Sequence, residues 1–123
     1  MEHKIWYDAE KQVLQVQIKG DFTTEQTLYF GKKYIELLEG KPYRQLIVDL
    51  REGRNMESRE TRSISNEMLN QAGITDVAYV GANAAARMIA KVLMKLGSLK
   101  AKSDFFKDFD DAFKWIEIRR KQI

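Results

Sequence analysis

Four arginines and a serine lie close together after a short apolar run that ends in Asp49. The arginines are Arg51, Arg54, Arg59 and Arg62, and the serine is Ser58. Guanidinium groups beside the free backbone N–H groups of a helix N-terminus favour phosphate and other anions. The segment is therefore a candidate anion-binding loop. Ser58, at the expected start of a helix, either caps that helix or accepts a phosphate there.

Acidic residues in the same segment support another interpretation. Glu52, Glu57 and Glu60 leave residues 51–62 with one net positive charge, so the arginines could pair locally with these glutamates on a solvated loop. Asp49, at the end of an apolar strand, has to be solvated or hydrogen-bonded. It is either a catalytic carboxylate or, as we expect, the acceptor that anchors the following loop through backbone N–H groups.

A second candidate loop follows another apolar run and reads Val80-Gly81-Ala82-Asn83. Ligands of open α/β sheets usually bind at the carboxyl ends of the central strands, where both loops are expected. One glycine permits a tight turn but makes neither a P-loop nor a dinucleotide fingerprint, so we interpret Gly81 as a packing turn. Asn83 is a plausible helix cap and the last candidate ligand contact.

The amino-acid composition argues against several classes of function. The chain has 123 residues, no cysteine and one histidine, which argues against disulfide, zinc-ribbon, iron–sulfur and thiol chemistry. We expect a single domain over residues 1–123, with no catalytic residue, metal or cofactor. The net charge of +3 comes from interspersed charges of both signs, so no nucleic-acid partner is expected. Neither a membrane-spanning run nor a signal peptide is recognisable, which favours a cytoplasmic location.

The expected elements alternate after an N-terminal hairpin. Leu14, Val16 and Ile18 alternate with glutamines, the period of a strand with one wet face, and a polar turn joins this strand to residues 5–7. Gly20 and Asp21 should end the strand. Thr23 with Gln26 three places later is a capping-box pattern that begins a helix.

Further along, residues 46–50 and 77–81 have the apolar, non-alternating pattern of strands covered on both faces. Residues 51–57 are predicted as a loop, and helices are predicted from Ser58 to Gly73, over 84–96 and from about Asp108. A weak strand is expected at 99–102. The order β-β-α-β-α-β-α-(β)-α predicts an α/β fold with a mostly parallel sheet of four or five strands, an N-terminal antiparallel hairpin and about four flanking helices.

This order of elements resembles the SpoIIAA-like family, which is related to STAS domains and linked with Sec14-type folds. The resemblance is carried by the hairpin, the helix after Gly20-Asp21-Phe22-Thr23, residues 46–50 and 76–81, and the closing block 105–116 with Ala112 and Trp115. It implies a bacterial, non-catalytic regulatory or binding module. A protein partner or a small anionic or lipid ligand would fit such a module.

The resemblance also implies a regulatory site. Antagonists of the STAS class carry Asp-Leu-Ser, a short spacer and Met-Asp-Ser-Ser-Gly, and Asp49-Leu50 and Met56-Glu57-Ser58 fall on matching positions. Ser58 would then be the phosphoacceptor of a phospho-switch. Arg51, Arg59 and Glu60 replace the two other serines and the glycine of that motif.

Three hypotheses remain open at this stage. The first is a binding module that uses the two loops. The second is a small enzyme in which Asp49 acts on a substrate held by the arginines. The third is a homodimer formed through the apolar helix expected at 84–96.

Overall fold

The computed structural model describes residues 3–56, 59–84, 87 and 99–122, with only the backbone of residues 53–56, 59, 60 and 62. Eight elements have defined bounds. They are β1 (Lys4–Asp8), β2 (Val13–Phe22), α1 (Thr24–Leu38), β3 (Gln45–Met56), α2 (Arg59–Gln71), β4 (Asp76–Val80), β5 (Lys102–Phe106) and α4 (Phe109–Lys121).

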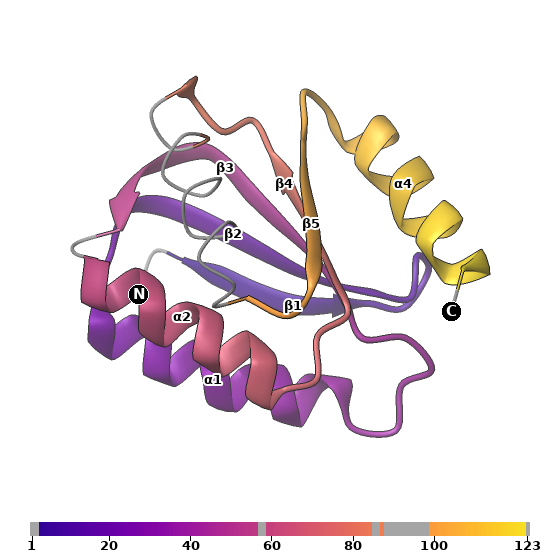
Figure 1. Ribbon diagram of the computed structural model, residues 1–123, viewed down its shortest axis with the longest axis horizontal. Coiled ribbons are helices and arrows are strands. Elements are labelled where there is room, and N and C mark those ends of the chain that lie inside the picture. The colour runs from indigo at the N-terminus through magenta and orange to yellow at the C-terminus, as the bar shows by residue number, and fades with distance from the viewer. Residues whose placement is uncertain (1–2, 57–58, 85–86, 88–98, 123) are drawn as a thin grey trace.

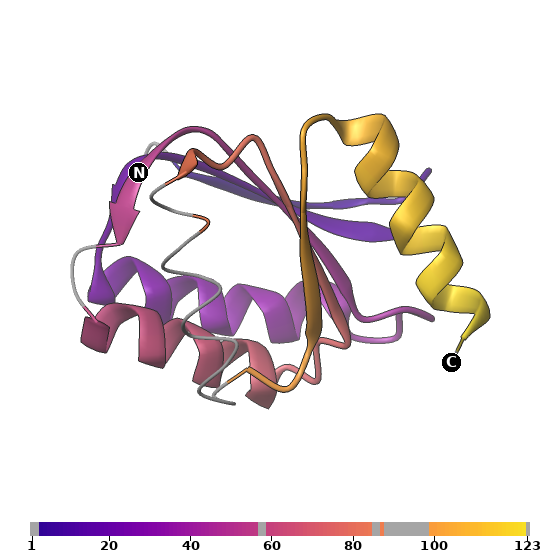
Figure 2. The same ribbon diagram turned by 45° about the horizontal axis from the view of Figure 1, so that its top comes forward.

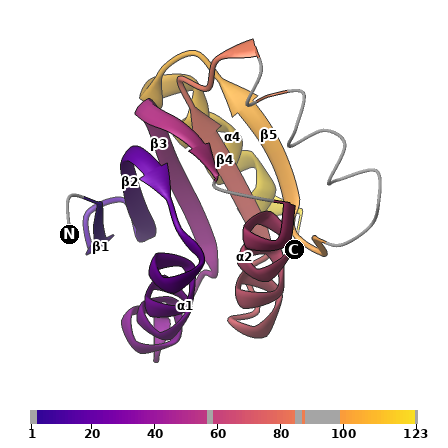
Figure 3. The same cartoon turned by 90° about the vertical axis from the view of Figure 1, so that its left-hand side faces the viewer.

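The strands form one mixed sheet in the order β1-β2-β3-β4-β5. β1 is antiparallel to β2, and the remaining neighbours are parallel. Helices α1 and α2 cover one face of the sheet, and α4 lies on the other (Figures 1, 2 and 3). The predicted α/β fold with an N-terminal hairpin is confirmed. Of the four expected helices, the one at 84–96 falls mostly outside the described residues, although Ala84 and Arg87 are helical.

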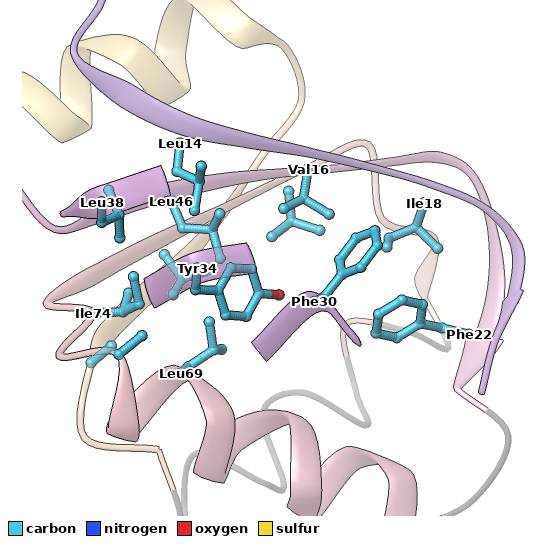
Figure 4. Close-up of a cluster of buried hydrophobic side chains, with 14 residues drawn as sticks. Leu14, Val16, Ile18, Phe22, Phe30, Tyr34, Leu38, Leu46, Leu69 and Ile74 are labelled. Atoms are coloured by element: carbon cyan, nitrogen blue, oxygen red, sulfur yellow. The ribbon is translucent and has the colours of Figure 1, made fainter. Parts of the chain in front are cut away.

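The main hydrophobic core lies between the sheet and the pair α1–α2 (Figure 4). Leu14, Val16 and Ile18 point into it, so the alternation in β2 predicted the buried face correctly. Phe30 and Tyr34 of α1 fill its centre. The two helices approach closely at Gly31, where a Cβ atom would overlap the Met68 side chain of α2.

A smaller core lies under α4 on the other face. Ala112 and Ile116 of α4 pack on Val13, Ile47, Ala78 and Val80 of the central strands. Beyond them on this face, Trp6 of β1 is 43% exposed. The second face is therefore only partly covered by the described elements.

The helix ends follow the predicted signals. Thr23 accepts from the Gln26 amide while the Gln26 side chain accepts from the Thr23 amide, a complete capping box. Asp108 caps α4 by accepting from the amide of Asp111. Acidic residues in the first turn of α4 and basic residues in its last turn suit the helix dipole.

Four predicted boundaries were wrong, the first being the end of β2, which lies at Phe22. Residues 51–56, predicted as part of a loop, continue β3, because β2 itself runs beyond Gly20 to Phe22 and offers its backbone as a partner. Hydrogen bonding to that partner outweighs the polar composition of the segment. The strand expected at 99–102 instead spans Lys102–Phe106, with Phe106 packing on the α4 side. The helix predicted to reach Gly73 ends at Gln71.

A buried polar network holds α4 against the amino ends of β3 and β4. Asp76, with no exposed surface, accepts from Arg119 Nε at 2.7 Å, Gln45 Nε2 at 3.1 Å and Thr75 Oγ1 at 2.9 Å. Gln45, also fully buried, donates to the backbone oxygen of Ile116 as well. Three donors satisfy the buried carboxylate, which would otherwise be costly to remove from water.

Arg120 extends this network to the β1–β2 turn. Its Nε donates to Gln45 Oε1 at 2.6 Å, and its Nη2 donates to the backbone oxygens of Lys11 and Gln12. The guanidinium also lies 4.2 Å from the ring centroid of Tyr43. One helix end is thus joined to three separate parts of the chain.

Replacing the buried carboxylate should therefore destabilise the whole domain. We expect Asp76→Ala to lower the free energy of unfolding by about 3 kcal/mol, because Arg119 and Gln45 lose their acceptor and Arg119 is only partly exposed. Urea denaturation followed by circular dichroism measures this. Asp104→Ala, at an exposed position on β5, is the matched control. Equal losses in both variants would contradict the role assigned to the network.

Candidate functional site

The carboxyl end of β3 departs from regular strand geometry. Between the pairs Gln17↔Asp49 and Lys19↔Glu52, β2 advances by two residues while β3 advances by three. The extra residue is a β-bulge, a feature that redirects side chains and is often found beside functional sites. It lies at Leu50–Arg51, directly after the apolar run that the sequence predicted.

Asp49 and Arg51 form a tight pair across this bulge. Arg51 Nε donates to Asp49 Oδ1 at 3.0 Å, and Nη2 donates to Oδ2 at 2.9 Å, the two-pronged geometry that a guanidinium favours. The backbone amide of Arg51 also donates to Oδ1 at 3.0 Å. The prediction that Asp49 anchors the following segment through a backbone N–H is confirmed.

This pairing sets the ionisation of Asp49, whose residue surface is only 5% exposed. Burial by itself would raise the pKa of the carboxyl group. Hydrogen bonds from the Arg51 side chain and amide, the Arg51 charge and a weaker bond from Gln17 together outweigh it, so the pKa of Asp49 is held below its ordinary value. Asp49 is therefore a stable carboxylate and an unfavourable general acid.

Gly81 and Phe109 also help to position the Arg51 side chain. Gly81 has φ +75°, and a Cβ atom there would overlap Cγ of Arg51, so the side chain crosses the turn where glycine leaves room. The guanidinium carbon then lies 5.0 Å from the ring centroid of Phe109 at the start of α4. The Arg51 side chain nevertheless remains 58% exposed.

The predicted arginine cluster is only partly within the described residues. Of the predicted site residues, the structure brings Asp49 and Arg51 together. The side chains of Arg54, Arg59 and Arg62 and the whole of Ser58 lie outside the described part of the chain. Asn83 is exposed and directly precedes helical Ala84, and its backbone oxygen accepts from the amide of Arg87, which is consistent with the predicted cap.

Arg51 does not pair with a neighbouring glutamate among the described side chains. Glu52 contacts Lys19 on β2 instead, at 3.8 Å between exposed side chains, and such contacts contribute little stability. Glu57 and the side chain of Glu60 are not described. Among the described side chains, Arg51 pairs with the buried Asp49.

Sequence reasoning missed two contributors to the site and the role of a third. Gln17 belongs to the polar face of β2, and only the parallel register with β3 places it beside Asp49. Phe109 lies in the closing block 105–116, and nothing in its local pattern predicted a contact with Arg51. Gly81 was correctly predicted as a packing turn, but the side chain that passes over it was not identifiable.

Other chemistry has little support in the described part of the chain. No cluster of three or more potential metal ligands occurs among the residues that were placed. His3 is buried in a structural role: its Nδ1 accepts from the Lys19 amide and its Nε2 lies 2.9 Å from the backbone oxygen of Asp21. Within the described ranges, no helix is both long and apolar enough to span a membrane.

Comparison with known proteins identifies the family of the chain. A family model described as a domain of unknown function, DUF7793, matches residues 6–119. The chain belongs to the DUF7793 family. No curated protein matches it.

Two solved structures share the fold of this DUF7793 domain. An uncharacterised DUF3478-family protein from Shewanella loihica PV-4 with a SpoIIAA-like fold superposes with a TM-score of 0.69, at 18% identity over 92% of each chain. The anti-sigma factor antagonist SpoIIAA in its unphosphorylated form gives 0.62, at 8% identity over 96% of this chain and 97% of that one. The SpoIIAA-like fold expected from the sequence is confirmed, and at these identities the likeness shows the fold alone.

The turn at Gly81 offers a direct test of how Arg51 is positioned. Gly40 has nearly the same φ, +74°, but nothing lies within 4 Å of the place that a Cβ atom would take there. Gly40→Ala should therefore cost only the left-handed backbone penalty, about 1 kcal/mol. Gly81→Ala should cost more, because Arg51 must also move. Chemical denaturation compares the two, and equal costs would contradict the close approach of Arg51 to the turn.

Acid titration tests the Asp49–Arg51 pair. A carboxyl group whose pKa is lower in the folded state stabilises the fold above its unfolded-state pKa and loses that contribution as the pH falls through the folded-state value. The stability difference between the native chain and Asp49→Asn should thus be constant above about pH 5 and shrink below it. Urea denaturation at several pH values measures the difference. Arg51→Gln should reduce the same pH dependence; an unchanged acid profile in both variants would refute the pairing.

Proposed function

We propose that this domain is a non-catalytic regulatory module that binds an acidic group of a protein partner at Arg51. The observation that carries the proposal is the arrangement of the Arg51 guanidinium, which is held by Asp49 and supported by Phe109 yet is mostly exposed. A side chain that is already fixed loses little conformational entropy when it binds. The Asp49 pair uses Nε and Nη2, and among the described residues none accepts from Nη1.

The surroundings suit a protein partner. Asp49 neutralises part of the Arg51 charge, so the site favours a carboxylate presented by a larger surface over a free, highly charged anion. The neighbouring Lys19–Glu52 contact is exposed and weak, and its lysine can be released to a competing acidic group. The fold is shared with an anti-sigma factor antagonist, a protein named for action through another protein, which supports the same class of function.

The two buried aspartates argue against the alternative of a small enzyme. Asp49 is committed to Arg51, and its lowered pKa is the opposite of what a general acid needs at neutral pH. Asp76 is committed to Arg119, Gln45 and Thr75 at the other end of the sheet. The phospho-switch at Ser58 remains an alternative. A small anionic ligand and a lipid ligand are further alternatives, which the probes below separate.

The proposal is tested by titrating the isotope-labelled chain with a hexaglutamate peptide at low salt and recording amide chemical shifts. Shifts of Gln17, Arg51, Gly81 and Phe109 are expected because these residues line the site. Arg51→Gln should weaken binding about tenfold or more, the usual effect of losing a charge-assisted contact. Lys32→Gln, which removes the same charge from an exposed position on α1, should leave the shifts at the site unchanged.

Two further probes distinguish the alternatives. If inorganic phosphate shifts the same amides at lower concentration than the peptide does, the ligand of the site is a small anion and not a protein partner. Binding only to vesicles that contain phosphatidylglycerol would indicate a lipid ligand. No response at the site to any probe, or equal weakening in the Arg51 and Lys32 variants, would refute the proposed site.

A further inference from the structure

We propose that two copies of this chain associate by antiparallel pairing of their β1 strands, centred on Trp6. β1 is one edge of the five-stranded sheet, and Figure 3 shows it at the outer side of the ribbon. An edge strand presents backbone N–H and C=O groups that another extended strand can pair with. The strand that fits this edge best is the β1 strand of a second copy, because the five residues of β1 are complementary to one another in antiparallel pairing.

The sequence of β1 is complementary to itself. It reads Lys-Ile-Trp-Tyr-Asp, with Trp6 in the middle. Antiparallel pairing about Trp6 places Lys4 opposite the partner's Asp8, and Ile5 opposite the partner's Tyr7. Opposite charges and apolar pairs directly across antiparallel strands each stabilise the pairing. Twofold symmetry makes every such contact twice, apart from Trp6 at the axis.

The side chains are arranged on the two faces as this pairing requires. Ile5 and Tyr7 pack against the main core, so Lys4, Trp6 and Asp8 belong to the α4 face of the sheet. Trp6 is 43% exposed, unusual for the largest apolar side chain of the strand. A second Trp6 at the axis would cover part of this surface. Asp8 is held in place because its carboxylate accepts from the Lys11 amide and from Gln15 Nε2.

The other edge of the described sheet lacks this complementarity. β5 reads Lys-Ser-Asp-Phe-Phe, and the same operation would place Asp104 directly opposite the partner's Asp104. Like charges across a pair are destabilising. Lys102 would face the partner's Phe106, with no charge to meet it. Self-pairing is therefore specific to β1.

The length of the strand sets the strength of the association. Five residues per copy contribute much less area than the roughly 1,600 Å² of a standard stable interface. The dimer should therefore be weak and depend on protein concentration. Sedimentation velocity of the native chain over a wide concentration range should show a rising weight-average sedimentation coefficient.

Charge reversal tests the register. Lys4→Asp turns both Lys4–Asp8 contacts into repulsions and should raise the dimer dissociation constant about tenfold or more. Lys102→Asp makes the same change at the first residue of β5 and should have no effect. Circular dichroism checks that both variants fold. A native chain that stays monomeric at every concentration, or equal weakening by the two variants, would overturn the proposal.

A cross-link tests the centre of symmetry. The chain has no cysteine, so a single Trp6→Cys substitution places one thiol at the axis. Opposed residues of antiparallel strands have Cα atoms about 4.5–5.5 Å apart, within the range of a disulfide. Mild oxidation should give a covalent dimer of this variant and much less of the control Asp104→Cys. Association of the native chain without preferential cross-linking at position 6 would overturn the β1 register and indicate another surface.

Discussion

The carboxylate of Asp76 is the point on which the arrangement of this domain depends. It has no contact with solvent, and its three donors come from the start of β3, the residue before β4 and the end of α4. A buried carboxylate tolerates few geometries, because each lost donor leaves a charge unsatisfied in a medium that solvates it poorly. The apolar contacts of Ala112 and Ile116 hold α4 against the sheet, while the polar network fixes where along the sheet the helix lies. The position of Phe109, at the other end of α4, follows from this attachment.

The two ends of the sheet are therefore built differently. At the amino ends of β3 and β4, buried donors and acceptors satisfy one another. At the carboxyl ends, a bulge, a left-handed glycine and an exposed guanidinium occur close together. Regular pairing would have directed Arg51 elsewhere, and a side chain at Gly81 would have blocked its path. The bulge and the left-handed glycine, which interrupt the regular sheet geometry, also present a fixed cation to solvent. Natural proteins often depart from regular structure at functional sites.

Much of the fold could be predicted from periodicity and caps, because these signals are local. The alternation of Leu14, Val16 and Ile18 and the capping box at Thr23 each depend on residues within a few positions. The end of β3 was mispredicted because its pairing depends on how far β2 extends, which its own polar residues do not reveal. The roles of Gln45 and Asp76 were not predictable for a similar reason. Each is a polar residue just before an apolar run, and only the register of two parallel strands places them against the end of α4. Asp49 was predicted correctly because its partner is two residues away, whereas Phe109 is 58 positions from Arg51 and shares no local pattern with it.

The proposed dimer and the proposed binding site affect one another through the symmetry of a sheet. Antiparallel pairing of two edge strands has its twofold axis perpendicular to the sheet, so both copies turn the same face to the same side. Trp6, Arg51 and α4 belong to one face, so the dimer would present both Arg51 sites on that face, at opposite ends of the joined sheet. A partner with two acidic segments would then bind the second site at a high effective concentration, so that two weak contacts combine into a stronger one. By linkage, such a partner would also stabilise the β1 pairing, because it binds the paired form more tightly than the single chain. An edge strand that by itself supports only a weak dimer would then respond to the presence of its partner, which is how a module without catalytic chemistry could regulate.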